Sequence, residues 1–214
     1  MSKRSTPTPT SPTPTWPLLS SPTGATYSPS RTHRYLLWRT WNPDSPRVCF
    51  VLLNPSTATA QVLDPTLTRC KGFAVKWGFG GMVVANAFAL RSTSPAGLKT
   101  VADPNGPRND DAILYAAKSA DRVVLGWGNH ASYQDRHATV MALIERELLL
   151  SRCGYFRLTA SGMPTHPLYL PADMPLLPFA ELPAGPSQAS AAPSNAGVPS
   201  TSPKPRRSTV TNPA

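Results

Sequence analysis

The sequence is poor in long hydrophobic stretches, in cysteine and in acidic residues. No apolar run in its 214 residues approaches the roughly 18–20 residues that span a bilayer, so we expect no transmembrane helix. The first residues, MSKRSTPTPTSPTPTWP, include basic side chains but no apolar segment behind them. We therefore expect no secretory signal.

The three cysteines are Cys49, Cys70 and Cys153, an odd number at wide spacing. This pattern fits neither a disulfide framework nor a zinc site. Cys49 and Cys70 lie within apolar patterns, which is typical of buried, reduced thiols. Such thiols favour a location in the reducing cytoplasm.

Signals for metals and cofactors are also missing. His130 and His137 are seven residues apart and have no accompanying carboxylate pattern, so we expect no metal site. The four glycines between residues 72 and 81 match neither glycine-rich phosphate-binding fingerprint. We therefore expect no cofactor.

Acidic residues are scarce relative to basic ones. The chain has 21 Lys and Arg against 11 Asp and Glu, a net charge of +10. Residues 1–30 and 183–214 contain no acidic residue and five of the basic ones, so the rest of the chain has a net charge of only +5. If the central part of the chain has a basic surface that binds nucleic acid, that surface has only this net charge of +5 to draw on.

Proline is abundant instead, and 14 of the 26 prolines lie in the same two terminal segments. Alternating Thr-Pro and Ser-Pro buries too little apolar surface to offset the entropy of ordering the chain. We therefore expect a disordered arm over residues 1–30, one α/β domain over residues 31–180 and a disordered basic tail over residues 181–214. The KPRR cluster in that tail either contacts nucleic acid or only aids solubility.

The central segment alternates between strand and helix signals. Four apolar runs are typical of buried strands, and they cover residues 48–53, 82–90, 123–127 and 155–159. Three segments have apolar residues at helical spacing, and they cover residues 65–77, 109–120 and 134–150. The repeated strand–helix–strand order predicts a three-layer αβα fold with a mostly parallel central sheet.

Residues 35–41 come before this alternating pattern. They are rich in aromatic and branched side chains, and they end at the turn signal Asn42-Pro43-Asp44-Ser45-Pro46. This predicts a strand that enters a hairpin, and hence an antiparallel edge strand at the N-terminal side of the sheet.

Polar residues follow each buried run. In an open parallel sheet the ligand crevice lies beyond the carboxyl ends of the strands. We therefore expect the polar clusters there to meet at one edge of the sheet. In chain order they are Asn54-Pro55-Ser56, Asn86 with Arg91, Trp127-Gly128, and His166 with Tyr169.

The same residues lie in motifs with a family resemblance. The segment 35–170 contains LLNPSTA, DPTLTRC, WGFGG, NAFALR, WGNH and HPLYLP, and it resembles the bacterial "domain of unknown function 1643" family. That resemblance implies no activity. More distantly, the order of the motifs resembles the uracil-DNA glycosylase superfamily, especially its mismatch-specific branch. The corresponding residues here are Asn54-Pro55, Pro65 to Arg69, Asn86, Trp127-Gly128 and His166-Pro167.

The superfamily resemblance implies a uracil-DNA glycosylase-like fold and roles for particular residues. Such enzymes flip a base into a pocket, position a water and stabilise charge on the leaving base. Asn54 would hold the water through its amide oxygen, and His166 would donate to the leaving base. The superfamily branch with Asp at the Asn54 position has a stronger electrostatic partner, which this sequence lacks. The catalytic candidates are Asn54, Asp64 and His166, and the substrate-binding candidates are Pro55, Ser56, Arg69, Asn86, Arg91, Trp127, Gly128 and Tyr169.

Each candidate also has a structural interpretation. Asn54 fits an ordinary turn, and the Asn86 amide fits a structural hydrogen bond. Asp64 is either a helix N-cap or a general base. The remaining alternatives are a loop position for His166, solvent-facing arginines, a core position for Trp127, and packing of Tyr169 at the end of the domain.

Three functions are consistent with this pattern. The favoured one is a glycosylase-like protein that acts on a nucleobase in DNA or a related nucleoside. The second is a binding module for a nucleotide or nucleic acid without turnover. The third is an accessory protein of a mobile element whose tails bind the partner. The expected partner is DNA or a nucleotide, and the sequence leaves the oligomeric state open.

Overall fold

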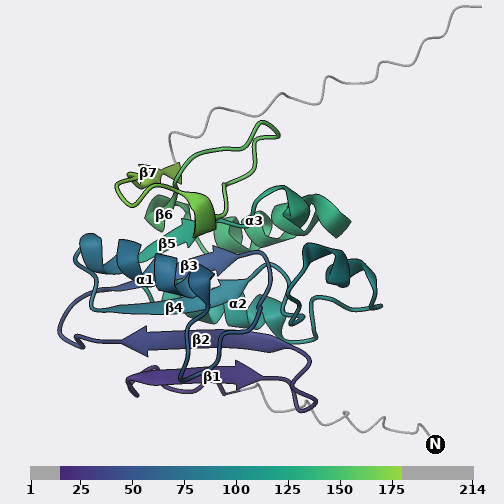
Figure 1. The fold of residues 1–214 in the computed structure, drawn as a ribbon, viewed down its shortest axis with the longest axis horizontal. Coiled ribbons are helices and arrows are strands. Elements are labelled where there is room, and N and C mark those ends of the chain that lie inside the picture. Colours follow the sequence, from purple (N-terminus) through teal and green to yellow (C-terminus); the bar gives the residue numbers. More distant parts are fainter. Residues whose placement is uncertain (1–14, 180–214) are drawn as a thin grey trace, which may run out of the picture. The chain divides into compact units, whose positions relative to one another are not determined.

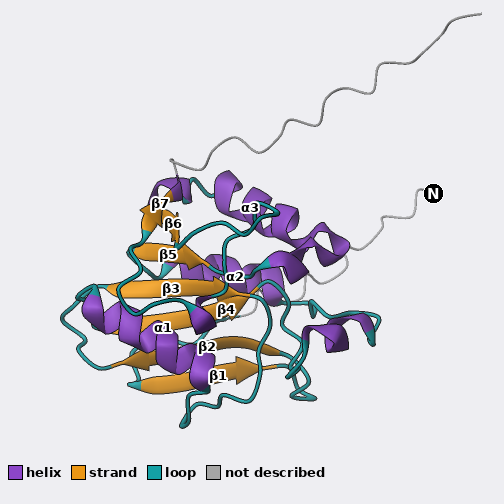
Figure 2. Cartoon of the chain, turned by 45° about the horizontal axis from the view of Figure 1, so that its top comes forward, coloured by secondary structure: helices purple, strands orange, loops and turns teal. Residues whose placement is uncertain are grey.

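The computed structural model describes residues 15–179, which contain one seven-stranded sheet and three α-helices (Figures 1 and 2). The strands are β1 (Thr23–Tyr27), β2 (Arg34–Thr40), β3 (Arg47–Leu52), β4 (Gly81–Asn86), β5 (Arg122–Leu125), β6 (Cys153–Tyr155) and β7 (Leu177–Pro178). The α-helices are α1 (Pro65–Lys76), α2 (Asn109–Lys118) and α3 (Arg136–Arg146). Four short 3-10 helices are η1 (Pro95–Lys99), η2 (Asn129–Asp135), η3 (Leu150–Arg152) and η4 (Pro167–Tyr169).

The sheet is parallel only in its centre. Its strand order is β1-β2-β4-β3-β5-β6-β7, and the pairs β4–β3, β3–β5 and β5–β6 are parallel. The outer pairs, β1–β2, β2–β4 and β6–β7, are antiparallel. The expected mostly parallel sheet is therefore too simple a description. The turn between β1 and β2 is short, and only a longer crossover connection allows parallel pairing.

The expected hairpin of residues 35–41 with the following strand is wrong. β2 pairs with β4, and β4 lies between β2 and β3. The backbone N–H groups of Trp41 and Asn42 both donate to the Gly80 carbonyl, just before β4. These bonds hold the end of β2 against β4, so the turn that follows leads the chain past β4 to the next position in the sheet.

The N-terminal segment contributes more to the fold than its composition suggests. Residues 23–27, which the composition places in the arm, form the edge strand β1. Leu19 is buried, and the Trp16 ring stacks on Tyr115 with ring centroids 5.9 Å apart. These aromatic and aliphatic side chains bury apolar area that the surrounding prolines do not. The part of the expected disordered arm in residues 1–14 and the expected disordered tail, residues 181–214, lie outside the described residues.

The helices cover both faces of the sheet. One apolar cluster joins alternate strand residues such as Phe50 and Leu52 to α1. The other cluster joins residues such as Cys49 and Val51 to α2 and α3. Alternation along β3 sends successive side chains to opposite faces, so helix layers lie on both sides of a central sheet (Figure 2). Cys49, Cys70 and Cys153 are all buried and unpaired, as expected for Cys49 and Cys70.

The helix signals around α1 are confirmed. The Asp64 side chain accepts a hydrogen bond from the Leu67 N–H at 2.9 Å, and Pro65 occupies the first helical position. Gly78 follows the helix with φ = +81°, which favours glycine. α3 begins later than the periodicity suggests, because Gln134 and Asp135 both adopt left-handed backbone angles. None of the helices between residues 15 and 179 combines the length and the hydropathy that crossing a bilayer requires.

Candidate functional site

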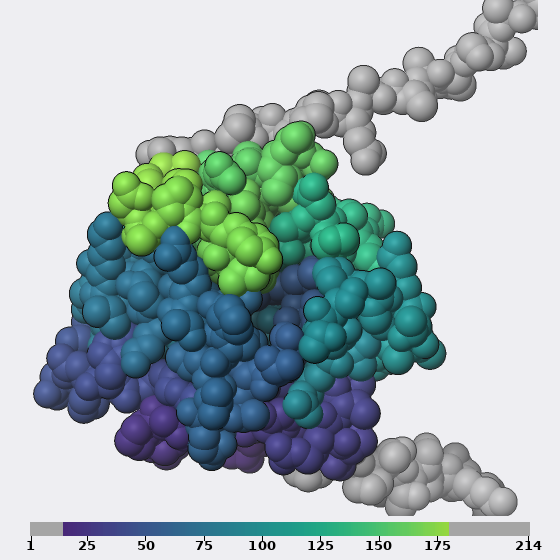
Figure 3. All heavy atoms as spheres, viewed as in Figure 1, coloured from purple at the N-terminus to yellow at the C-terminus, as the bar shows by residue number. Residues whose placement is uncertain are grey.

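A cavity of about 490 Å³ lies at the carboxyl edge of the parallel strands. Its wall is formed by loops that follow β3, β4, β5 and β6, and by the start of α1. Figure 3 shows a hollow on this side of the molecule, below the yellow-green atoms of the last described segment. We call this space the carboxyl-edge cavity. Seven of the candidate residues line it: Asn54, Ser56, Asp64, Trp127, Gly128, His166 and Tyr169.

The Asn54 side chain is held in one orientation. Its amide nitrogen donates to the backbone carbonyls of Pro55 at 3.0 Å and Ser92 at 2.7 Å. Both amide hydrogens are therefore used. Its oxygen, Oδ1, accepts no hydrogen bond from any residue between 15 and 179, so it remains free as an acceptor at the cavity wall.

Asp64 has both a structural role and a place in the cavity. One carboxylate oxygen, Oδ1, caps α1 through the Leu67 N–H. The other oxygen makes no hydrogen bond to the described part of the chain. The N-cap interpretation is therefore confirmed. The second carboxylate oxygen remains at the cavity wall as a negatively charged hydrogen-bond acceptor.

His166 lies in the loop that follows β6 and lines the same cavity. Burial lowers the pKa of its imidazole below the ordinary value of 6.5, and the nearby charge of Asp64 opposes that shift only in part. His166 is therefore neutral at pH 7. A neutral imidazole donates through one ring nitrogen and accepts through the other.

Trp127 and Gly128 form the part of the wall that follows β5. The Trp127 side chain is 2% exposed and belongs to the apolar core, which confirms its core position. Its indole Nε1 nevertheless has no hydrogen-bond partner within residues 15–179, and such buried donors are rare. Gly128 has φ = +70° and ψ = −173°, a conformation open essentially to glycine alone.

Tyr169 lies at the mouth of the cavity on η4 and is 91% exposed. The interpretation of Tyr169 as packing at the end of the domain is therefore wrong. Leu170, the next residue, is the one that is buried.

Asn86 does not line the carboxyl-edge cavity. Its side chain is 2% exposed, and its backbone carbonyl accepts from the side chain of Asn109 at 3.0 Å. Beyond Asn86 the chain stays paired with the neighbouring strand, because the N–H groups of Ala87 and Phe88 donate to Leu52 and Leu53. Asn86 therefore lies inside the sheet, and the chain reaches the cavity only at Ser92.

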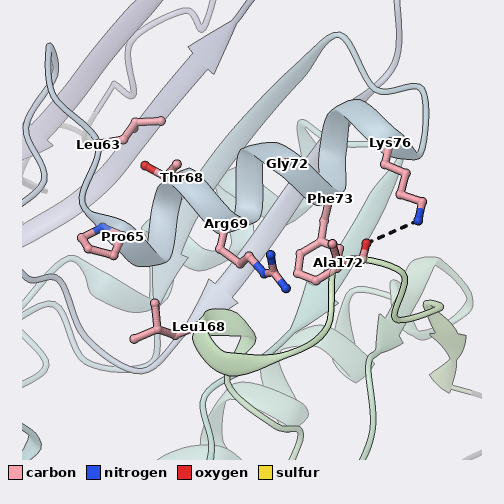
Figure 4. A pocket seen from close by; sticks show the side chains of 9 residues that line it. All are labelled: Leu63, Pro65, Thr68, Arg69, Gly72, Phe73, Lys76, Leu168 and Ala172. Atoms are coloured by element: carbon pink, nitrogen blue, oxygen red, sulfur yellow. Dashed lines mark hydrogen bonds between the residues drawn. The ribbon is translucent and has the colours of Figure 1, made fainter.

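Arg69 faces a different space, a groove of about 660 Å³ between α1 and the segment 168–172. Figure 4 shows Arg69 and Phe73 pointing from α1 toward this segment, and Lys76 bonded to the Ala172 carbonyl. The Arg69 guanidinium packs over the Phe73 ring and donates to the Leu170 carbonyl. Its contacts are thus with the chain itself.

Two further candidates lie beside the cavity. Pro55 is buried, and its carbonyl accepts from the Ser92 N–H at 2.8 Å, so it joins the loops that follow β3 and β4. Arg91 is exposed and lines an adjoining hollow together with Arg31.

Sequence reasoning missed several residues that shape the cavity. Ser92 and Thr93 bring the loop after β4 to the wall, and the run of small hydroxyl residues after Arg91 was the available signal. Arg34 is 2% exposed, and burial lowers its pKa to about 10, although Tyr27 and Asp64 oppose the shift. It donates to the Ala58 carbonyl beneath the loop that follows β3. Arg34 is the first residue of β2, and the residues next to it in the sequence contain no signal that its side chain is buried.

The comparison with protein families now identifies the chain. The model of a family described as "Protein of unknown function (DUF1643)" matches residues 34–168. The chain belongs to the DUF1643 family. No significant match was found among curated proteins or among solved structures. The DUF1643 segment contains β2 through β6 and every residue that lines the carboxyl-edge cavity except Tyr169, so it includes Asn54, Asp64 and His166.

Proposed function

We propose that this DUF1643 protein is a glycosylase-like hydrolase that cleaves the N-glycosidic bond of a nucleobase in DNA or a related nucleoside. The observation that carries the proposal is the free Asn54 oxygen in the cavity that Asp64 and His166 also line. The amide nitrogen of Asn54 donates two hydrogen bonds, and these fix the position of the oxygen. An amide oxygen fixed in this way is suited to orient an attacking water.

The cavity residues supply the groups that this hydrolysis requires. The water oxygen bonds to the sugar carbon C1′, and the bond from C1′ to the base nitrogen breaks with its electron pair moving to the base. Asn54 accepts a hydrogen bond from the water and orients it. The free oxygen of Asp64 takes the proton that the water releases, and its charge stabilises the cationic sugar. That proton then neutralises the departing base.

His166 acts on the leaving base in this scheme. Because burial lowers its pKa, His166 presents a neutral imidazole whose N–H donates to an oxygen on the base as negative charge develops there.

The size and position of the cavity also support the proposal. Its volume of about 490 Å³ lies within the common range of roughly 300–1,000 Å³ for small-molecule sites. It lies beyond the carboxyl ends of parallel strands, where open α/β sheets bind ligands. The motif order that resembles the mismatch-specific uracil-DNA glycosylases is a further argument. The three buried, unpaired cysteines suit a reducing compartment, and we propose the cytoplasm.

The test is base release from a panel of substrates. The full chain is incubated with single- and double-stranded oligonucleotides that each contain one modified or mismatched base, and with modified nucleosides. Alkaline strand cleavage and mass spectrometry detect abasic sites and free base. We expect release from at least one substrate, and a rate about 10²–10³-fold lower for Asn54→Ala. Asn42→Ala is the matched control, because Asn42 is exposed at the opposite edge of the sheet.

A non-catalytic binding module is the second candidate. The specific observation in its favour is that Asp64 is partly committed to capping α1, while the turn after β3 has Asn instead of Asp. Binding of a panel member without base release, weakened by Asn54→Ala, would establish this function. The absence of both release and binding across the panel would overturn both proposals.

A further inference from the structure

A second hollow, of about 510 Å³, adjoins the carboxyl-edge cavity. The two spaces share four lining residues, Ser56, Thr57, Ser92 and Thr93. All four have hydroxyl groups, so a polar rim separates the two spaces. We call the second space the arginine hollow, because Arg31 and Arg91 form its other side.

The two arginines are held in place before any ligand binds. The Arg31 guanidinium lies 4.2 Å and that of Arg91 lies 5.5 Å from the centre of the Tyr27 ring. Arg91 also donates from its side chain to the Arg31 carbonyl at 3.2 Å and from its backbone N–H to the Thr32 carbonyl at 2.9 Å. Arg31 has φ = +58°, an uncommon conformation for a residue with a side chain. Ordering of this kind lowers the entropic cost of binding.

The arginine hollow has positive charge that no described carboxylate neutralises. None of its lining residues is acidic, and neither arginine forms an ion pair within residues 15–179. Two cations that share one aromatic ring repel each other, and an anion between them removes that repulsion. The hydroxyls of Ser56, Thr57 and Thr93 have no hydrogen-bond partner in the described chain, so they add neutral donors.

We infer that the arginine hollow binds a phosphate group of the nucleotide whose base enters the carboxyl-edge cavity. Guanidinium groups match the paired oxygens of a phosphate, and hydroxyl donors complete its coordination. The inference rests on the proposed function for the identity of the base-binding space. It adds that the substrate is phosphorylated, either a mononucleotide or a nucleotide within a strand, and is not a free nucleoside.

Binding measurements test this directly and do not require base release. The probes are inorganic phosphate, thymidine, thymidine 5′-monophosphate and a fluorescent single-stranded oligodeoxynucleotide of mixed sequence, each with the full chain. The test variant is Arg31→Gln/Arg91→Gln. The matched control is Arg122→Gln/Arg146→Gln, which removes the same charge from two exposed positions that do not line the arginine hollow.

We expect the test variant to bind the phosphate-bearing probes at least about tenfold more weakly than the wild type. The slope of log K against log salt concentration should fall in magnitude by about 0.7 for the single-stranded oligonucleotide, because the two arginines together neutralise one phosphate. The test variant should bind thymidine as the wild type does. The control variant Arg122→Gln/Arg146→Gln should keep both the wild-type affinity for the phosphate-bearing probes and the wild-type salt slope. Equal losses in the control and the test variant would overturn the inference, because the effect would then come from net charge alone.

The same measurements distinguish the sources of the phosphate. If the monophosphate displaces the oligonucleotide and both depend on Arg31 and Arg91, the ligand is a mononucleotide. If only the oligonucleotide depends on them, the ligand is a strand. Both results support a phosphate site. If phosphate binding depends on the arginines but no substrate in the panel releases a base, the proposed hydrolase fails while the phosphate site stands.

Discussion

The two edges of the parallel sheet use their polar groups differently. At the amino edge, the backbone N–H of Arg47 donates to the Asp121 carboxylate, and the N–H of Asp121 donates back to the Arg47 carbonyl, both at 2.8 Å. At the carboxyl edge, Asn54 Oδ1 has no partner within residues 15–179. Polar groups that the fold leaves unpaired are available to a ligand, whereas the paired groups stabilise the fold.

The two edges also differ in free space. A Cβ atom on Gly80, at the amino edge, would lie 2.0 Å from the Asn42 carbonyl oxygen. A Cβ atom on Gly128, at the carboxyl edge, would come no closer than 3.8 Å to the His166 side chain. The hollow at the amino edge is about 210 Å³, less than half the carboxyl-edge cavity. Close packing at one edge and open space at the other indicate where a substrate fits.

The largest expected effects on stability come from these two glycines. Gly80→Ala forces a backbone contact apart, and we expect a loss of about 3 kcal/mol in the free energy of unfolding. Gly128→Ala makes only an ordinary van der Waals contact with His166 but keeps an unfavourable backbone conformation, so we expect a loss of about 2 kcal/mol. Urea unfolding measures both values. Gly72→Ala is the control: it is exposed within α1 with nothing near its added Cβ, and we expect a gain of about 0.5–1 kcal/mol. A larger loss at Gly128 than at Gly80 would contradict the difference between the edges.

A smaller effect separates the two roles of Asp64. Asp64→Ala removes the cap of α1 and should cost about 1 kcal/mol, whereas Asp64→Asn keeps a good N-cap and should leave stability nearly unchanged. Asp64→Asn also removes the charge that raises the pKa of His166, so this pKa should fall further. NMR titration of the imidazole measures the shift. Asp121→Asn, at the amino edge, is the control, and an equal shift in that variant would contradict a local effect of Asp64.

The smallest expected effect is the pH dependence that His166 contributes. Its pKa in the folded protein lies below the ordinary 6.5, so the unfolded chain binds more protons between those two values. The contribution of neutral His166 to the free energy of unfolding is therefore fully present above pH 6.5. It is lost as the pH falls from 6.5 through the lowered pKa of the folded protein. Urea unfolding at several pH values on both sides of 6.5 should show a weaker acid-side decrease in His166→Gln than in the wild type. Parallel decreases in the two proteins would show that His166 is not buried as a neutral group.

Local sequence signals predicted much of the fold because neighbouring residues decide helix ends and buried strands. Asp64-Pro65 and Gly78 mark the limits of α1, and the apolar run at residues 48–53 marks β3. The same signals could not predict β1, because its residues 23–27 become ordered only through pairing with β2.

The candidate site was predictable to a similar degree. Asn54, Trp127 and His166 each follow a strand, and strand ends at one edge bring such residues together. Asn86 failed because it lies inside the apolar run 82–90, and the chain stays paired with the neighbouring segment through Ala87 and Phe88. That pairing depends on the register with β3, a contact between distant parts of the chain.

By itself, the sequence determined the three α-helices and the central strands β3, β4 and β5, because caps, prolines and hydrophobic periodicity act over a few residues. Only the tertiary structure decided the strand order, the burial of Arg34 and the sharing of one rim by the cavity and the arginine hollow. Those features depend on hydrogen bonds and packing between segments far apart in the chain, whose free energies no local pattern contains.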